Sequence, residues 1–243
     1  VVSTYGDSLV MGYSSVTDYN STINRHLADF YNMLYTRAKV TDAQRIVVYS
    51  EESEVCPMSL INLKYILSMG ELDYSWCEYV GRTGGVYIYR NKYADSAVSF
   101  YTNTISKSEC ESMDEIGRRL LLKDTLIVPD GEDVLHDTET GEVTLGSFVA
   151  DGKYFTGTIS NEKEGFLLLT IPDQDGWEVY VDGKKTETIN GDYGFLAVKL
   201  AMAPGLAAGL ALAAAFFAVA FFLVCLGVII PKHVAAKSPI RFC

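Results

Sequence analysis

Short apolar runs separated by turn residues follow one another through the second half of the chain. Six of these runs lie between about residues 125 and 200, with turn sequences such as PDGED, NEKEG and DQDG between them. Such spacing predicts an antiparallel β-sandwich. In the run WEVYV, residues 177–181, apolar and polar side chains alternate, so one face of this strand is expected to be dry. Asp182-Gly183 predicts a two-residue hairpin turn directly after it.

The first hundred residues mix helical and strand patterns. Apolar residues recur at helical spacing over residues 23–34, which predicts one amphipathic helix. The segment CPMSLINLKYIL, residues 56–67, predicts a short helix that leads into a strand. RIVVYS, residues 45–50, and GGVYIYRNK, residues 84–92, predict further strands. We therefore expect a small α/β part over residues 1–96.

Another short helix is expected at the start of the sandwich. Ser112 and Glu115 have the spacing of a capping box, so this helix should begin there. Together with the strands that follow, it predicts a β-sandwich-like domain over residues 97–201. The predicted fold class is therefore α+β, with a small α/β amino-terminal part, an antiparallel β-sandwich-like domain and then one transmembrane helix.

The transmembrane helix is predicted from the apolar run 204–230, which contains no charged side chain. A helix of about 20 apolar residues crosses the hydrocarbon layer. A buried core helix is the alternative, but a core helix of this length normally has a polar face. Pro204 suits the first helical turn. Gly205 and Gly209 have the spacing of closely packed membrane helices, which points either to other transmembrane helices of the same full-length protein as partners or to chance in an alanine-rich run.

Charge is divided unevenly around this run. The part before it carries 17 basic and 31 acidic residues, whereas the tail, residues 231–243, carries three basic residues and no acidic ones. Cytoplasmic flanks of membrane spans are enriched in Lys and Arg. We therefore expect a cell membrane location, with residues 1–203 extracytoplasmic and a cytoplasmic basic tail. The net charge of −14 before the run repels nucleic acid, so nucleic-acid binding is excluded.

No metal or cofactor motif is complete. The three histidines have no ligand spacing, so we expect no metal site and no cofactor. The segment DGEDVLHDTETGE, residues 130–142, is rich in carboxylates but lacks the pattern of a calcium-binding loop, which favours a solvated loop. Among the cysteines before the run, Cys56 and Cys77 allow a disulfide, but we favour free buried thiols for these and for Cys110.

Aromatic side chains near the sandwich strands are candidates for carbohydrate contact, because a ring offers apolar area with a polar rim. Tyr180 lies on the wet face of its strand and is the favoured sugar-contact residue. Trp177 lies on the dry face, so a core position is favoured over sugar contact; Tyr193 also lies near these strands. Lys184, Lys185, Arg118 and Arg119 are candidate phosphate contacts, although the acidic field of the domain opposes a polyanionic ligand.

Three segments in order resemble the YfhO-type bacterial membrane protein family. FLLLTIPDQDGWEVYVDGKK, residues 166–185, resembles the carboxy-terminal end of that family. SLINLKYIL followed by GGVYIYRNK resembles an earlier pair of strands, and GYSSVTDYNSTINRHLADFY, residues 12–31, resembles a stretch ahead of a helix. The family usually has a further strand between the equivalent of residues 198–200 and the Pro-Gly of the span. We therefore expect this sandwich to lack one edge strand, and we expect no later span after Pro231.

The resemblance implies a polytopic membrane glycosyltransferase that takes a sugar from a polyprenyl-phosphate carrier and decorates an envelope polymer such as lipoteichoic acid. The acidic catalytic residues of such proteins lie in an early external loop of the multispan part, so the resemblance assigns no catalytic residue to this chain. The sequence does not begin with Met, which leads us to expect a carboxy-terminal portion of a longer protein.

Three functions remain open at this point. The chain is expected to position donor or acceptor in such a glycosyltransferase. The alternatives are a membrane-tethered, non-catalytic carbohydrate-binding module and a structural ectodomain needed for assembly.

Overall fold

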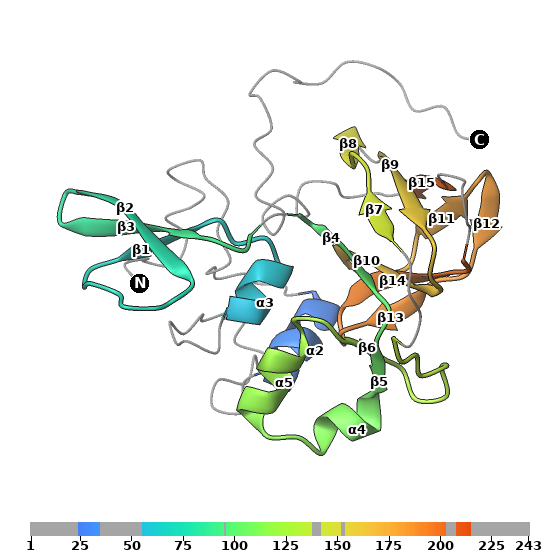
Figure 1. Ribbon diagram of the computed structural model, residues 1–243, viewed down its shortest axis with the longest axis horizontal. Coiled ribbons are helices and arrows are strands. Elements are labelled where there is room, and N and C mark those ends of the chain that lie inside the picture. Colours follow the sequence, from blue (N-terminus) through green and yellow to red (C-terminus); the bar gives the residue numbers. More distant parts are fainter. Residues whose placement is uncertain are drawn as a thin grey trace.

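The computed structural model describes residues 24–34, 55–94, 96–137, 142–151, 154–202 and 208–214. The helices in these ranges are α2 (Arg25–Leu34), α3 (Val55–Leu60), α4 (Lys107–Glu111) and α5 (Glu115–Leu121). The strands are β1 (Tyr65–Ser68), β2 (Cys77–Thr83), β3 (Val86–Asn91), β4 (Val98–Tyr101), β5 (Thr104–Ser106), β6 (Leu126–Val128), β7 (Val143–Leu145), β8 (Val149–Asp151), β9 (Tyr154–Asn161), β10 (Gly165–Pro172), β11 (Trp177–Val181), β12 (Lys184–Thr186), β13 (Ile189–Gly191), β14 (Phe195–Leu200) and β15 (Ala208–Ala214). Figure 1 shows α2, α3 and α5 between the β1–β3 sheet on one side and the larger group of strands on the other.

A four-stranded antiparallel sheet, in the order β13-β14-β10-β4, separates two hydrophobic clusters. Every residue of β10 is buried. Phe166 and Leu168 belong to one cluster, whereas Leu167 and Leu169 belong to the other. Successive side chains of a strand point to opposite faces, so a strand covered on both faces requires a continuous apolar run. The sequence FLLLTI meets that requirement.

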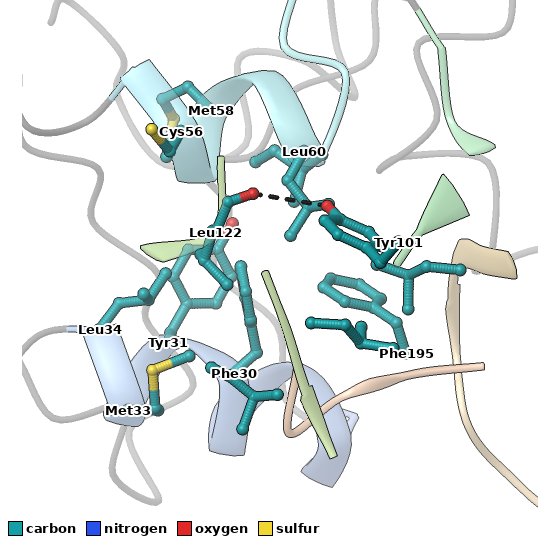
Figure 2. Close-up of a cluster of buried hydrophobic side chains, with 14 of the residues drawn as sticks. Phe30, Tyr31, Met33, Leu34, Cys56, Met58, Leu60, Tyr101, Leu122 and Phe195 are labelled. Atoms are coloured by element: carbon teal, nitrogen blue, oxygen red, sulfur yellow. Dashed lines mark hydrogen bonds between the residues drawn. The ribbon is translucent and has the colours of Figure 1, made fainter. Parts of the chain in front are cut away.

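Helices cover the first face of this sheet. Phe30 of α2 packs edge-to-face on Phe195 of β14, with ring centroids 4.8 Å apart. Figure 2 shows these two rings in the same cluster as side chains from α3 and the end of α5, and the Tyr101 hydroxyl donates a hydrogen bond to the Leu122 carbonyl oxygen at 3.4 Å. The predicted amphipathic helix is confirmed, and it begins where the Asn24 side chain accepts from the His26 backbone N–H.

A second sheet covers the opposite face, which confirms the expected antiparallel strand architecture. Its strands follow the order β12-β11-β15-β9-β7, and β8 also pairs with β9. Val179 of β11 and Ile159 of β9 are buried in the second cluster with β10 and β14. The predicted turn at Asp182-Gly183 is also confirmed, because both residues have positive φ, as a two-residue turn between β11 and β12 requires.

The prediction of one transmembrane helix over residues 204–230 is wrong where the structure describes this run. Ala208–Ala214 form β15, which pairs with β11 on one side and β9 on the other. Among the helices that the structure describes, none has the length and apolar character needed to cross a bilayer. The physical reason is that β9 and β11 each offer a row of backbone hydrogen-bonding groups, and β15 satisfies both rows. The predicted tail, residues 231–243, lies outside the described residues.

β15 follows Pro204-Gly205 in the sequence and lies inside its sheet, between β11 and β9. It therefore does not occupy the place between residue 200 and the Pro-Gly where the family has its further strand, and the expectation that this strand is absent stays a prediction. The predicted boundary between residues 96 and 97 stays a prediction. Residues on both sides of it, such as Phe30 and Leu168, share one hydrophobic cluster.

Two helices, rather than one, lie near the predicted capping box. Ser112 follows the end of α4, and α5 begins after Asp114, whose side chain accepts from the Gly117 backbone N–H. The expected cap was thus misplaced by two residues, because an aspartate next to the helix performs the same capping as a serine. The predicted strand over residues 45–50 lies outside the described residues.

Candidate functional site

A cavity of about 830 Å³ lies where α2, α4 and α5 approach β6 and the turn between β13 and β14. Its wall contains three cationic side chains, three carboxylates, one imidazole and one tyrosine ring, together with a short apolar stretch from the end of β6. Small-molecule sites are generally of this size. The cavity is therefore the candidate binding site among the described residues.

The floor of the cavity depends on the β13–β14 turn, Gly191-Asp192-Tyr193-Gly194. Asp192 and Tyr193 both have positive φ, of 49° and 64°, which side chains other than glycine rarely adopt. The Gly194 backbone N–H donates to the Gly191 carbonyl oxygen at 3.1 Å and closes the turn. A side chain at position 194 would meet the backbone of α2, because an added Cβ would lie 2.5 Å from the His26 carbonyl oxygen. The backbone of this turn thus packs directly against the backbone of α2.

Asp192 fixes the turn to β6 from inside the protein. Its Oδ1 accepts from the Ile127 backbone N–H at 2.9 Å, and its own backbone N–H donates to the Ile127 carbonyl oxygen at 2.9 Å. The side chain is completely buried, and Oδ2 has no hydrogen-bond partner in the part of the chain that the structure describes. Burial raises the pKa of this carboxyl to about 7, and the Ile127 hydrogen bond opposes that shift only in part.

Tyr193 places its ring in the cavity wall beside two side chains of α4. Its hydroxyl donates to Glu111 Oε1 at 3.1 Å, and Lys107 Nζ lies 5.0 Å from the ring centroid. Lys107 and Glu111 form a loose ion pair at 3.9 Å. Burial is the main cause that raises the pKa of the Tyr193 hydroxyl, so this group is a neutral donor.

A polar chain from three segments forms another part of the wall. The Asn190 amide nitrogen donates to Asp173 Oδ2 at 3.2 Å and lies 3.3 Å from His26 Nδ1. The amide has two hydrogens, so it serves both partners when Nδ1 is the unprotonated ring nitrogen. This arrangement directs the proton of a neutral imidazole to Nε2.

Arg118 adds a cation to the cavity wall. Its Nε is buried and has no hydrogen-bond partner among the described residues. The neighbouring Arg119 differs, because it forms an ion pair with Glu115 and donates from Nε to the Leu34 carbonyl oxygen. Arg119 therefore joins α5 to α2, whereas Arg118 lines the cavity with part of its side chain while its Nε is buried.

Of the predicted contact residues, Arg118 lines the cavity, whereas Trp177, Tyr180, Lys184 and Lys185 lie on the β11–β12 hairpin. Tyr180 and Lys185 are cross-strand neighbours, and both bind Glu178: the Tyr180 hydroxyl donates at 3.0 Å and Lys185 Nζ at 2.5 Å. Glu178 thus forms an ion pair with the Lys185 amine, which was predicted to contact phosphate. Trp177 packs edge-to-face on Phe155 against the second cluster, as a core position requires. The sugar-contact and phosphate-contact roles of this hairpin, Lys184 included, stay predictions.

Sequence reasoning found Tyr193 only as an aromatic near the strands and Arg118 only as a possible phosphate contact, and it considered His26 as a metal ligand and rejected that role. The usable signal was the sequence NGDYG, since a hairpin turn centred on Asp-Tyr departs from the usual Asn-Gly or Asp-Gly. In the ranges that the structure describes, no group of three potential ligands has metal-binding geometry. The favoured free thiols are observed at Cys56, Cys77 and Cys110, although Cys77 is only partly buried.

Residues 142–203 match the family model described as Bacterial membrane protein YfhO, which confirms the resemblance to that family. The matched segment contains β7 to β14 and therefore includes the NGDYG turn and the β11–β12 hairpin. No curated protein matches the chain significantly. No solved structure does so either. The family match supports a bacterial membrane protein associated with the lipid bilayer.

Proposed function

We propose that this chain provides the carbohydrate-positioning domain of a YfhO-type bacterial membrane protein, and that the cavity beside Tyr193 holds part of a saccharide. The larger activity would be transfer of a sugar from a polyprenyl-phosphate carrier to an envelope polymer such as lipoteichoic acid, on the outer face of the membrane. The catalytic carboxylates would come from another part of the same protein, as the family resemblance implies.

One observation carries this proposal: the cavity wall combines an aromatic ring with donors and acceptors that are held in place. A sugar ring has an apolar face bordered by hydroxyl groups, so it is complementary to a tyrosine ring flanked by polar side chains. Asp173 and Glu111 supply acceptors, and Lys107 and Arg118 supply cationic groups. The cationic and anionic side chains are equal in number, which suits a hydroxyl-rich ligand better than a highly charged one.

The test removes the ring without breaking the turn. Glycine adopts positive φ without strain, so Tyr193→Gly should relieve about 1 kcal/mol of backbone strain while losing a similar amount of ring burial. We expect near-wild-type stability but saccharide binding about fivefold weaker, since an aromatic contact contributes about 1 kcal/mol. Binding would be measured by saturation-transfer NMR on the full chain, with neutral hexoses and N-acetylhexosamines.

Tyr180→Ser on the β11–β12 hairpin is the matched control, because it removes a tyrosine from the same fold but away from the cavity. It should leave binding unchanged. If Tyr180→Ser abolished binding and Tyr193→Gly did not, the saccharide would bind the hairpin and the cavity assignment would be wrong. Absence of binding by the wild-type chain would favour the structural ectodomain instead.

A further inference from the structure

The β1–β3 sheet exposes an unusual amount of aromatic and apolar surface. Tyr65 and Tyr79 are each 56% exposed, and Val80 is 55% exposed. The strand order is β1-β3-β2, so β2 lies at the edge of this sheet. Figure 1 shows the β2–β3 hairpin extending away from the helices. An exposed apolar edge is normally avoided in soluble proteins, so this one requires an explanation.

Tyr79, Arg82 and Tyr87 lie on one face of this hairpin, hereafter the tyrosine face. The strand register pairs Arg82 with Tyr87 and Tyr79 with Tyr89. Tyr89 is buried in the same cluster as Phe30, so only the part of this face beyond Tyr89 is exposed. The Tyr79 and Tyr87 ring centroids are 6.4 Å apart, and the Arg82 guanidinium carbon lies 4.5 Å from the Tyr87 ring centroid. A register shift between Tyr79 and Gly81 places Val80 in a bulge next to this face. The tyrosine face thus combines amphipathic rings with a cation.

The local charge of this sheet differs from that of the surrounding chain. Residues 64–93 contain four basic and three acidic side chains, whereas the rest of the first 203 residues contains 13 basic and 28 acidic ones. One acidic group lies at the tyrosine face, since the Tyr87 hydroxyl donates to Glu71 Oε1 at 3.2 Å. Residues 64–93 therefore carry a net charge of +1, whereas the rest of the first 203 residues carries −15.

We propose that the tyrosine face contacts the headgroup layer of an anionic lipid membrane. Tyrosine is enriched at membrane–water interfaces because its ring is apolar and its hydroxyl is polar. Arginine places its apolar stem along such a surface while its guanidinium meets lipid phosphates. The acidic remainder of the domain is repelled by the same surface, so the contact would be confined to this sheet. The argument uses none of the cavity residues and is independent of saccharide binding.

The experiment reports depth at a single position in the full chain. Tyr79→Trp places a fluorophore on the tyrosine face, and Tyr154→Trp, at a residue of β9 that is 47% exposed, is the matched control. The chain would be reconstituted into phosphatidylcholine vesicles with or without phosphatidylglycerol. Brominated lipids report contact with lipid, and acrylamide reports contact with water. The unmodified chain supplies the background from Trp76 and Trp177.

We expect quenching by brominated lipid and protection from acrylamide for Tyr79→Trp in vesicles containing phosphatidylglycerol, and neither effect for Tyr154→Trp. Adding Arg82→Gln should lower the ratio of docked to undocked protein about fivefold, because the attraction of one surface cation to an anionic membrane raises this ratio about fivefold. Equal quenching at the two positions, or full acrylamide access at position 79, would overturn the proposal. Protection in detergent micelles that rises with protein concentration would also overturn it, because a second copy of the chain would then cover the face.

Discussion

The buried Asp192 carboxyl should make the protein less stable as the pH rises from about 5 to about 8. In the folded protein its pKa is raised to about 7 from an ordinary value of 3.8, mainly because burial disfavours the charged form. The charge of Asp192 helps to raise the pKa values of the nearby Tyr101 and Cys110 side chains. Neither of these two groups carries a positive charge that would stabilise the ionised carboxyl. Folding therefore favours the protonated acid, and its stabilising effect is lost as ionisation proceeds.

The magnitude follows from proton linkage. A raised folded-state pKa gives stability that is complete below the unfolded-state pKa and is lost as the pH rises through the folded-state value. With the two values above, the free energy of unfolding should fall by about 3 kcal/mol between about pH 5 and about pH 8. Asp130, Asp133 and Glu178 have lowered pKa values, so the stability they provide is lost only at more acidic pH.

Urea unfolding of the full chain at a series of pH values would measure this effect, with Asp192→Asn as the comparison. Asparagine keeps an oxygen for the Ile127 N–H and tolerates positive φ, but it does not ionise. The variant should lack the decline seen in the wild type, so the difference between the two curves should widen by about 3 kcal/mol towards high pH. Parallel curves for the two proteins would refute the reasoning.

Two further substitutions test the backbone arrangement. Leu212→Pro should destabilise the sheet by about 2 kcal/mol in urea unfolding, because proline removes a ladder hydrogen bond from a strand paired on both sides; an unchanged midpoint would argue against β15. Gly194→Ala should cost about 1 to 3 kcal/mol, since its Cβ would lie 2.5 Å from the His26 carbonyl oxygen, whereas Gly70→Ala, with open space around it, should be neutral. Equal midpoints for the two alanine variants would contradict the close approach of the turn to α2.

Local patterns predicted the parts of the fold that depend on local physics. The strand over FLLLTIP and the Asp182-Gly183 turn follow from residue type alone, because apolar continuity and positive φ are properties of short segments. The resemblance of this region to the YfhO-type family was also noted from the sequence, and the same region matches the family model. Sequence reasoning was therefore most successful between β7 and β14.

The candidate site could not be predicted in the same way, because its contacts join distant segments. His26 and Asn190 are 164 residues apart in sequence, and Asp192 contacts Ile127 across 65 residues. Each of these residues has an ordinary local interpretation as a helix, strand or turn position. Only the packing of α2 and β6 against one hairpin turn assembles them into a cavity wall.

The apolar run after residue 203 shows most clearly where hydropathy alone is insufficient. Hydropathy describes side chains, and it favours removal from water without specifying the secondary structure that achieves it. Backbone pairing makes that choice for Ala208–Ala214, which form five residue pairs with β11 and six with β9. Without β15, those two strands would each keep an unpaired edge in the middle of the sheet order. The requirement that both strands satisfy their backbone groups therefore explains a strand in a segment whose composition predicts a membrane helix.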